Sequence, residues 1–319
     1  MGMFELGPAL GKVRSPELPD SISCHVAGGP QSGNKRVRAE RPKGDAVSGN
    51  VGRYCAKRTP AKGSRQVQTV QKDMLDWWQD QQQEFRRAWE IQRDLLPKNI
   101  PPLPGCQISG RCQPARAVGG DYFDVLKFTD GTVGLCIADA AGKGIPAALL
   151  MANLQSGVKL LASPSLPPKE LCQRVNSLVC NNVTPGKFIT LFYCLLDTHR
   201  RSLVYANAGH NPPMLLRRDD TVLRLCEGGL LLGFREESRY QQGEVDIAPG
   251  DWILLFTDGL TEGCSADDEQ FGEERLLSLL AANRELEAAE LQKKVIQAVE
   301  GFSGGCLEDD MTLVVVRVE

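Results

Sequence analysis

The chain lacks the residue patterns that mark several large classes of protein. It has only three His, and none of its 11 Cys forms a CxxC pair, so a zinc site is not expected. Most of the Cys lie in apolar segments, which favours buried free thiols in a reducing compartment. No apolar run approaches the ~18 residues of a membrane-spanning helix, and no GxxxxGK[ST] phosphate loop is present. The N-terminus has no signal-peptide core either, so we expect a cytoplasmic protein without membrane insertion.

Charge is distributed unevenly along the 319 residues. Residues 1–70 carry 12 Lys/Arg against 5 Asp/Glu, whereas residues 71–319 carry 25 against 35. A basic N-terminal segment would suit nucleic acid or anionic lipid. Residues 1–65 are also rich in Gly, Pro and Ser and have no apolar periodicity, so the favoured interpretation is a solvated, disordered segment without a nucleic-acid partner.

Residues 66–104 change character. A stripe of mainly apolar residues recurs every three or four positions, with polar residues between them. This pattern predicts a long helix over residues 66–96. The stripe consists of Met74, Trp77, Gln81, Ala88, Ile91 and Leu95. It would suit a coiled coil with a second copy, or packing against the chain's own domain. The neighbouring Trp77 and Trp78 favour pairing, because they leave more apolar surface than one seam requires. Pro97 ends the helix, and further prolines up to Pro104 form a stiff connector.

Residues 105–319 form short, regularly punctuated segments. The alternating or continuous apolar runs predict strands at 107–113, 122–128, 133–138, 188–197, 202–208, 214–217, 222–225, 243–247, 252–257 and 311–318. Helical spacing predicts helices at 168–182, 273–282 and 288–301, and an earlier one with a face formed by Leu150, Leu154, Val158 and Leu161. Hairpin-linked strands around two helix pairs indicate an α+β domain with antiparallel sheets.

Four acidic positions lie at the boundaries of these apolar runs. Asp121 follows Gly119-Gly120, Asp139 follows the run 133–138, Asp258 ends WILLFTD, and Asp309 or Asp310 precedes MTLVVV. Taken singly, Asp121 reads equally well as a turn residue and Asp139 as a helix cap. Two like charges about 4 Å apart repel by about 4 kcal/mol at an effective dielectric constant of 20, so a cluster would need cations. Oxygen ligands favour Mg²⁺ or Mn²⁺. The first hypothesis is therefore a carboxylate metal site with two ions.

Nine motifs occur in one order: WEIQRDLLP, PARAVGGDYFDV, IADAAGKGIPAALLM, GKFITLFYCLLD, LVYANAGHNPPMLL, GGLLLGF, APGDWILLFTDGLTEG, FGEERL and DDMTLVVVRV. This order, from about Ala88 to the C-terminus, resembles the SpoIIE/RsbU-type bacterial phosphatases. That group is a branch of the metal-dependent (type-2C-like, PPM) protein serine/threonine phosphatases. The resemblance implies an αββα sandwich of two antiparallel sheets flanked by helices, within residues 105–319.

The resemblance also implies a site with two Mn²⁺ or Mg²⁺ ions. Its ligands would be Asp121, Asp139, the Ala140 carbonyl, Asp258 and Asp309, with the four aspartates also the catalytic residues. Asp310 is the less favoured ligand of its pair. Two such ions activate a water for attack on phosphorus, so no Ser or Cys nucleophile is required.

The implied substrate is a phosphorylated STAS-domain protein that antagonises an anti-sigma factor. The helix at 66–96 resembles a regulatory linker, so an activating protein or homodimerisation through it is expected. Two alternatives stay open: a non-catalytic phosphoprotein-binding module on the same fold, and a hydrolase of small phosphate esters.

Several lesser positions are left with two interpretations each. Family members often carry Glu where this chain has Ala117, a change expected to tune activity. Lys143 would either contact phosphate or an acidic substrate, or be a solvated helix-start lysine. Asn207 and His210, in NAGHNPP, favour a structural turn over a catalytic histidine. Thr190 and Arg116 are possible neighbours of the site and are not assigned to it. That completes the set of candidate residues.

Overall fold

The computed structural model describes residues 62–319, apart from residues 101, 184–185 and 306. The predicted disorder of residues 1–61 therefore lies outside the described residues. Helix α1 spans Lys62–Leu95, so it begins four residues before the predicted start at 66, and residues 62–65 are helical. It ends two residues before Pro97, as predicted from the loss of the backbone donor.

Two mainly antiparallel sheets form the centre of the domain. One sheet has the order β1 (Cys106–Gln113), β11 (Met311–Val318), β10 (Trp252–Phe256), β6 (Met214–Leu216) and β7 (Val222–Arg224). The other has the order β2 (Tyr122–Lys127), β3 (Val133–Ala140), β4 (Ile189–Asp197), β5 (Ser202–Ala208) and β8 (Gly228–Gly229), with β9 (Gly243–Asp246) also paired to β5. Only the short β5–β8 pair is parallel among these strands of the described chain. The predicted α+β class is confirmed.

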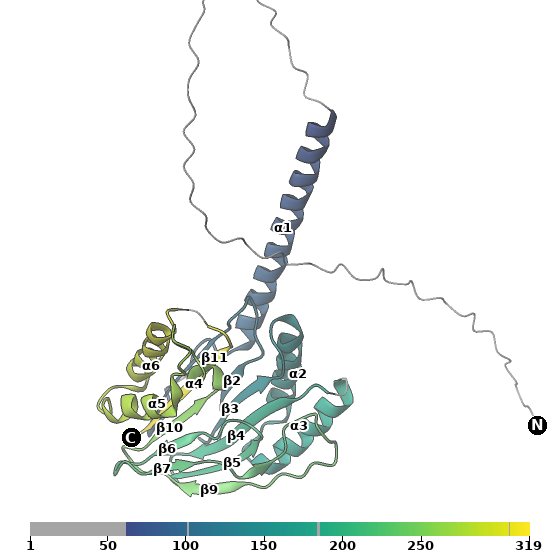
Figure 1. Ribbon diagram of the computed structural model, residues 1–319. Coiled ribbons are helices and arrows are strands. Elements are labelled where there is room, and N and C mark those ends of the chain that lie inside the picture. The colour runs from purple at the N-terminus through teal and green to yellow at the C-terminus, as the bar shows by residue number, and fades with distance from the viewer. Residues whose placement is uncertain (1–61, 101, 184–185, 306) are drawn as a thin grey trace, which may run out of the picture. The chain divides into compact units, whose positions relative to one another are not determined.

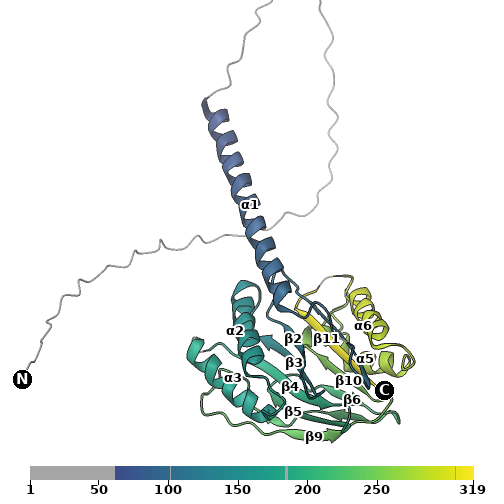
Figure 2. The same ribbon diagram turned by 180° about the vertical axis from the view of Figure 1, so that it is seen from behind.

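Helices cover the outer faces of both sheets. Helices α2 (Ile145–Leu161) and α3 (Pro168–Asn182) lie over the β2–β5 sheet, and α5 (Gly272–Ala281) and α6 (Ala288–Phe302) lie over the sheet that contains β10 and β11 (Figures 1 and 2). A single turn, α4 (Asp258–Thr261), follows β10. The layers run helix, sheet, sheet, helix, which is the αββα sandwich that the motifs led us to expect.

The strand pattern explains these layers. Successive side chains of a strand point to opposite faces, so a strand between two apolar layers is apolar throughout. In β3, Leu135 and Ile137 pack between the sheets, while Cys136 and Ala138 pack under α2 and α3. The same alternation in β11 sends even-numbered residues such as Val314 to the inter-sheet layer and odd-numbered residues to α6. Each strand thereby assigns a fixed face to every residue near its ends.

Local signals define the helix boundaries near the site. Gly144 precedes α2 with φ of +72°, a value that favours glycine, and Pro146 occupies the first turn, where its missing N–H costs nothing. Helix α6 begins with a capping box between Glu287 and Glu290. Among the described helices, none is long and apolar enough to cross a membrane.

Helix α1 contacts the domain through its C-terminal turns. Its described side chains from 72 onward are exposed or half-buried, with the exception of Gln92. The amide of Gln155 in α2 donates to the carbonyl oxygen of Leu95 at 3.2 Å, and Leu96 packs against both core layers on that side. The helix is therefore anchored at one end and presents most of its length to solvent.

Candidate active site

The candidate site lies at one end of the layer between the two sheets. Asp121 is two residues before the inward-facing Phe123, and Asp139 is two residues after the inward-facing Ile137. Strand alternation therefore directs both carboxylates to the inter-sheet face. Thr190 is the register partner of Asp139, and Thr312 lies two residues before the inward-facing Val314. The inter-sheet core thus ends in acidic and hydroxyl side chains.

Two threonine hydroxyls fix one oxygen of Asp121. Thr257 Oγ1 donates to Asp121 Oδ2 at 2.8 Å, and Thr312 Oγ1 donates to the same oxygen at 2.7 Å. The Thr312 backbone N–H in turn donates to Thr257 Oγ1 at 2.9 Å, which orients that hydroxyl. Burial, followed by the negative charge of Asp139, raises the pKa of Asp121 well above its usual value. No hydrogen bond to Oδ1 occurs among the described residues, so both threonine hydroxyls act on the other oxygen.

Three glycines allow the backbone around the site to pack closely. A Cβ on Gly119 would lie 2.3 Å from Asp310 Oδ2, and one on Gly120 would lie 2.6 Å from the Ala140 carbonyl oxygen. A Cβ on Gly259 would lie 2.1 Å from the Asp310 carbonyl oxygen. Real Cβ atoms do not approach so closely, so only glycine permits these loops to meet. The Ala140 carbonyl is in this way brought beside the loop that carries Asp121.

Asp139 and Asp258 are both affected by the negative charge of neighbouring carboxylates. Asp139 is the second-to-last residue of strand β3, which continues to Ala140. The residue that directly precedes α2 is Gly144 and not Asp139. The interpretation of Asp139 as a helix cap is therefore wrong. Burial, then the charges of Asp258 and Asp309, raises its pKa to about 7. Asp258 is the first residue of α4, and burial and the charge of Asp309 raise its pKa.

The structure separates the roles of Asp309 and Asp310. Asp310 is buried, and its two oxygens accept the backbone N–H groups of Ala115 at 2.8 Å and Gly120 at 2.6 Å. Its carboxylate is thus committed to holding the glycine loop before Asp121. Asp309 is about two-fifths exposed, and its charge acts on both Asp139 and Asp258. These contacts favour Asp309 over Asp310 as the residue that faces a ligand.

Lys143 contributes a positive charge at the edge of the cluster. Its Nζ lies 2.9 Å from Asp309 Oδ2 and donates to the Glu308 carbonyl oxygen at 2.7 Å. Arg116 lies against the same turn, since a Cβ on Gly144 would be 3.8 Å from its Cδ. The structure therefore places Lys143 in an ion pair at the site, and Arg116 beside it.

Asn207 has the structural role that the sequence favoured. Its Oδ1 accepts the His210 backbone N–H at 2.7 Å, and its Nδ2 donates to the His210 carbonyl oxygen at 3.0 Å. The His210 ring is buried, and its Nδ1 lies 2.9 Å from Thr190 Oγ1. Burial lowers the pKa of His210 to about 4. The ring is therefore neutral at pH 7 and is not poised to donate a proton.

The residues present fit a hydrated divalent cation. Within the described ranges, no group of three or more His, Cys, Asp or Glu side chains is arranged so that it could hold a metal ion by itself. Mg²⁺ is usually bound by one or two carboxylates and keeps several waters, so a closed cage is not required. A set of carboxylates, a nearby backbone carbonyl and no thiolate or imidazole ligand matches that preference. The raised pKa values of Asp121, Asp139 and Asp258 reflect burial first and neighbouring negative charge second, and a cation would offset both.

The sequence interpretation missed Thr257, Thr312 and Gln92. The signal for the two threonines was available, because each lies beside a motif aspartate and at an inward-facing position of its strand. Gln92 bonds both the N–H and the carbonyl of Gly119. It gave no such signal, because a glutamine on a helix is ordinarily a solvated residue.

Known proteins share these motifs and this architecture. The family model described as "Stage II sporulation protein E (SpoIIE)" matches residues 129–319. Phosphoserine phosphatase RsbU of Bacillus subtilis is 31% identical over 240 residues, which cover 75% of this chain and 71% of RsbU. The chain belongs to the SpoIIE family. As a SpoIIE-family member of the PPM phosphatases, it is a protein serine/threonine phosphatase.

Solved structures show the same fold as this SpoIIE-family chain. The SiaA-PP2C domain of Pseudomonas aeruginosa superposes with a TM-score of 0.66 at 21% identity, covering 78% of this chain and 99% of that one. The catalytic domain of the serine/threonine phosphatase PstP, solved with two manganese ions, gives a TM-score of 0.51 at 18% identity, covering 67% and 98%. The αββα sandwich is therefore that of the PP2C-type phosphatases.

The raised pKa of Asp139 predicts how the free energy of unfolding of the metal-free protein depends on pH. Its pKa is about 7 when folded and 3.8 in the unfolded reference, so the folded state binds more protons between these values. The stability that this group contributes is present below pH 4 and is lost as pH rises through 7. The side chain in Asp139→Asn does not ionise. In chelator at pH 8, the free energy of unfolding of this variant should therefore exceed that of wild type by on the order of a few kcal/mol.

Urea unfolding at pH 5 and pH 8 checks this difference. His210 contributes equally to both proteins, because Asp139 is not a cause of its pKa shift. Asp121, whose pKa the Asp139 charge raises, ionises more easily in the variant and therefore widens the gap at pH 8 in the same direction. A gap between wild type and Asp139→Asn that is the same at both pH values would contradict the prediction.

Proposed function

We propose that this chain is a divalent-metal-dependent phosphoserine/phosphothreonine phosphatase whose substrate is a phosphorylated STAS-domain protein. The observation that carries the proposal is the convergence of Asp121, Asp139, Asp258 and Asp309 at one end of the inter-sheet layer. Such a group of carboxylates is costly without cations, and its oxygen donors suit Mg²⁺ or Mn²⁺. The manganese-bound PP2C-type neighbour agrees with this chemistry.

The proposed ligands are the four aspartates and the Ala140 carbonyl. Bound ions, two in this proposal, would supply a water of lowered pKa and offset charge on the phosphoryl oxygens. Thr257 and Thr312 hold Asp121 so that its second oxygen faces the site. Lys143 and Arg116 provide cationic side chains at the rim, where a phosphoryl group would enter. Attack by water on phosphorus requires no protein nucleophile.

Asp258→Asn tests the metal-dependent activity. It removes one negative charge where α4 begins, with little change in side-chain volume. Phosphate release from a phosphoserine STAS-domain protein should need Mn²⁺, stop with chelator, and fall by about 100-fold or more in the variant. The readout is inorganic phosphate at fixed enzyme concentration.

The same assay separates the alternatives. A folded wild type that binds the phosphoprotein but releases no phosphate would favour the non-catalytic binding module. A wild type that hydrolyses small phosphate esters as well as the phosphoprotein, with each inhibiting the other only weakly, would favour the small-ester hydrolase. Either outcome would overturn the proposed substrate class.

Asp309→Ala and Asp310→Ala form a matched pair of neighbouring substitutions. Asp310→Ala leaves the N–H groups of Ala115 and Gly120 without their acceptor, so we expect a loss of about 2–4 kcal/mol of unfolding free energy. Asp309→Ala removes a partly exposed ion pair and the acceptor of a single backbone N–H, that of Asp310, so its loss of unfolding free energy in chelator should be smaller, about 1 kcal/mol.

Mn²⁺ titration then distinguishes the two positions by function. Asp309→Ala should bind Mn²⁺ at least about tenfold more weakly while remaining folded, because it removes a proposed ligand. Normal Mn²⁺ affinity in folded Asp309→Ala would remove Asp309 from the proposed ligand set.

The proposed biological setting is partner switching that controls a sigma factor. The relative RsbU is named as a phosphoserine phosphatase, and one solved neighbour joins an RsbU domain to an RsbW domain in a Mycobacterium tuberculosis protein, at 25% identity. By analogy, removal of phosphate from the STAS-domain antagonist would let it bind its anti-sigma factor. We propose a cytoplasmic location for the same reason.

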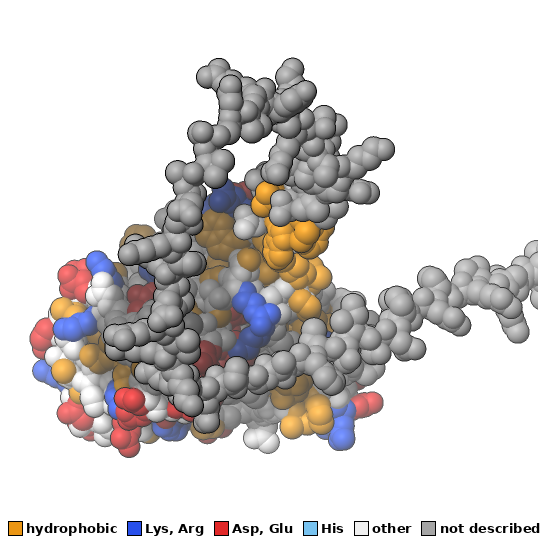
Figure 3. Space-filling model, turned by 45° about the horizontal axis from the view of Figure 1, so that its top comes forward, with side chains coloured by type: hydrophobic (Ala, Val, Ile, Leu, Met, Phe, Trp, Pro, Cys, Tyr) orange, Lys and Arg blue, Asp and Glu red, His pale blue; other side chains and the backbone are white. Residues whose placement is uncertain are grey.

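Helix α1 is the proposed contact for a second copy or an activating protein. Its exposed large apolar side chains, 39–65% accessible, are Met74, Leu75, Trp77, Trp78, Phe85, Trp89 and Ile91. Figure 3 shows hydrophobic side chains gathered on this helix. A groove of about 810 Å³ beside it is lined by Phe85 and Trp89 together with Arg86, Arg111 and Arg116. Exposed aromatic residues at this density are typical of protein interfaces.

We expect the chain to form a homodimer through α1. In the double variant Trp77→Glu/Trp78→Glu, the concentration at which half of the chains sediment as dimers should rise by at least about tenfold. The reason is that each aromatic side chain buried in an interface contributes strongly to binding. Leu160→Glu is the control, because Leu160 is equally apolar and 81% exposed, but lies on α2. A wild type that sediments as a monomer at high concentration would count against the dimer.

A further inference from the structure

His210 is a buried polar residue to which the proposed phosphatase chemistry gives no role. Its Nδ1 lies 2.9 Å from Thr190 Oγ1, and the Asn207 side chain bonds both the N–H and the carbonyl oxygen of its backbone. An imidazole has a polar nitrogen on each side, so burying it is costly unless both nitrogens meet partners. The groups on the two sides of the ring therefore indicate what it does.

Thr190 places one side of the ring next to Asp139. It lies on β4 directly opposite Asp139 of β3, and it is two residues before the inward-facing Phe192. Strand alternation therefore directs the Thr190 hydroxyl and the Asp139 carboxylate to the same inter-sheet face. Thr190 Oγ1 is also 3.4 Å from the Asp139 carbonyl oxygen. Since a hydroxyl has a single proton, the shorter contact, to His210 Nδ1, is the favoured hydrogen bond.

The backbone of Phe256 lies on the other side of the ring. Burial lowers the pKa of His210 to about 4, and a hydrogen bond with the Phe256 backbone acts on this pKa in the opposite direction. Nε2 forms no other hydrogen bond within the described part of the chain. Because a carbonyl oxygen only accepts, this contact favours a neutral ring with its proton on Nε2, and with Nδ1 accepting from the Thr190 hydroxyl.

The ring therefore connects the two sheets at the level of the acidic side chains. Thr190 belongs to β4 of one sheet, whereas Phe256 is the last residue of β10 in the other. Asp139 is the register partner of Thr190, and Asp258 follows Phe256 by two residues. Each contact of the ring is thus adjacent to one of two carboxylates that come from different sheets.

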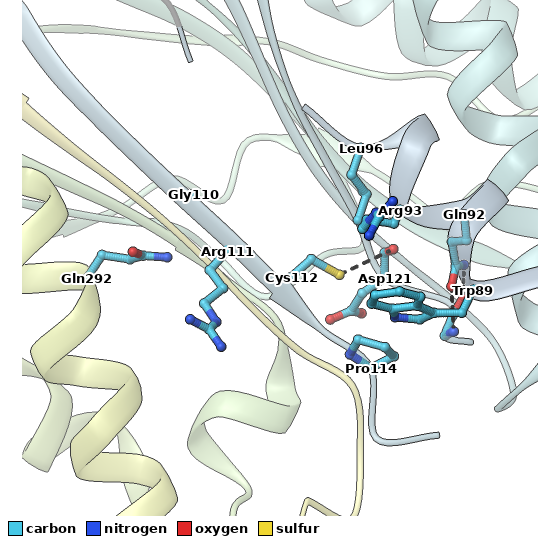
Figure 4. Close-up of a pocket in the computed structure, with 11 residues that line it drawn as sticks. Trp89, Gln92, Arg93, Leu96, Gly110, Arg111, Cys112, Pro114, Asp121 and Gln292 are labelled. Carbon is cyan, nitrogen blue, oxygen red and sulfur yellow. Dashed lines mark hydrogen bonds between the residues drawn. The ribbon is translucent and has the colours of Figure 1, made fainter. Parts of the chain in front are cut away.

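Asp139 has less direct support than Asp121. Asp121 Oδ2 accepts two threonine hydroxyls, and Figure 4 shows Asp121 beside Cys112, whose thiol donates to the Asp121 carbonyl oxygen at 3.8 Å. The Asp139 carboxylate accepts no hydrogen bond from the residues that the structure describes. The separation of Asp139 and Asp258 therefore depends on the strands that carry them and on the groups that lie between those strands.

We propose that His210 is the positioning residue that fixes the separation of Asp139 and Asp258, and thereby the affinity of the site for a divalent cation. The inference rests on the proposed function, in which both aspartates are metal ligands. A metal site needs its ligands held to within about 0.5 Å, and a rigid ring bonded to both sheets supplies that constraint. The neutral ring also adds no positive charge that would compete with a cation for the carboxylates.

Direct Mn²⁺ binding to the full chain, measured by calorimetry, tests the proposal. His210→Phe keeps a ring of similar size and removes both nitrogens, so it should weaken Mn²⁺ binding by about tenfold or more. Thr190→Val removes one hydroxyl and keeps the side-chain shape, so it should act in the same direction. Because both substitutions break one connection, the double variant should bind Mn²⁺ about as weakly as His210→Phe alone.

Two further variants are the controls. Thr190→Ser restores the hydroxyl, so its Mn²⁺ affinity should be within about twofold of wild type. Asp251→Asn alters a buried side chain at the opposite end of β10, where Asp251 pairs with Arg217 and accepts the Ala248 N–H. Its Mn²⁺ affinity should also stay within about twofold of wild type, because it lies far from the site. The Thr190 pair carries the test if His210→Phe does not fold.

Nitrogen NMR of the histidine rings adds a readout that needs no metal. The chain has only three His, so the signals of His210 can be assigned with His210→Phe. In chelator at pH 7 the His210 ring should be neutral, with its proton on Nε2. Thr190→Val should move the Nδ1 signal, because Nδ1 loses its donor, whereas Thr190→Ser should leave this signal near its wild-type position.

Four outcomes would overturn the inference. Folded His210→Phe with wild-type Mn²⁺ affinity would remove His210 from this role. An equal loss of affinity in Asp251→Asn would show that general loosening of β10 is the cause. A charged ring at pH 7, or a proton on Nδ1, would contradict the assigned contacts. Wild type that binds no Mn²⁺ would overturn the proposed function as well, whereas a wild type that binds Mn²⁺ and releases phosphate keeps that function whatever His210 does.

Discussion

The mutual repulsion of Asp121, Asp139, Asp258 and Asp309 is the constraint on which the rest of the site depends. The two sheets bring these carboxylates to one end of a layer that is otherwise apolar, where burial and neighbouring charge raise the pKa values of Asp121, Asp139 and Asp258. Such an arrangement is costly in a metal-free chain. The surrounding contacts hold it with uncharged donors, chiefly the hydroxyls of Thr257 and Thr312, and leave the negative charge available to a cation.

The loops around the site are held in place by many close backbone contacts. Glycines at 119, 120 and 259 let three segments approach to distances that no Cβ allows. Asp310 then uses its whole carboxylate on backbone N–H groups. Loops that carry function are usually mobile, so this density of contacts indicates selection for a fixed position. The fold itself, an αββα sandwich, contributes the rigid strands from which these loops emerge.

Much of this arrangement follows from the sequence. Strand alternation alone places Asp121 and Asp139 on the inter-sheet face, and most predicted strand and helix boundaries agree with the structure to within one or two residues. The turn α4 and the two-residue β8 were missed because neither is long enough to show a period. The distinct roles of Asp309 and Asp310 depend on the position of a loop nearly 200 residues away, which no local pattern encodes. Gln92 was missed for the same reason.

The uncharged amide of Gln92 connects helix α1 to the glycine loop beside this site. A lysine or arginine in place of Gln92 would compete with a cation for the carboxylates, and an aspartate or glutamate would add to their repulsion. A glutamine pairs with both groups of one peptide unit and leaves the local charge unchanged. Its two hydrogen bonds contribute on the order of 1–3 kcal/mol, small beside the ~5–15 kcal/mol of a folded domain. Loss of these two hydrogen bonds would therefore release the loop before Asp121 while the sandwich stays folded.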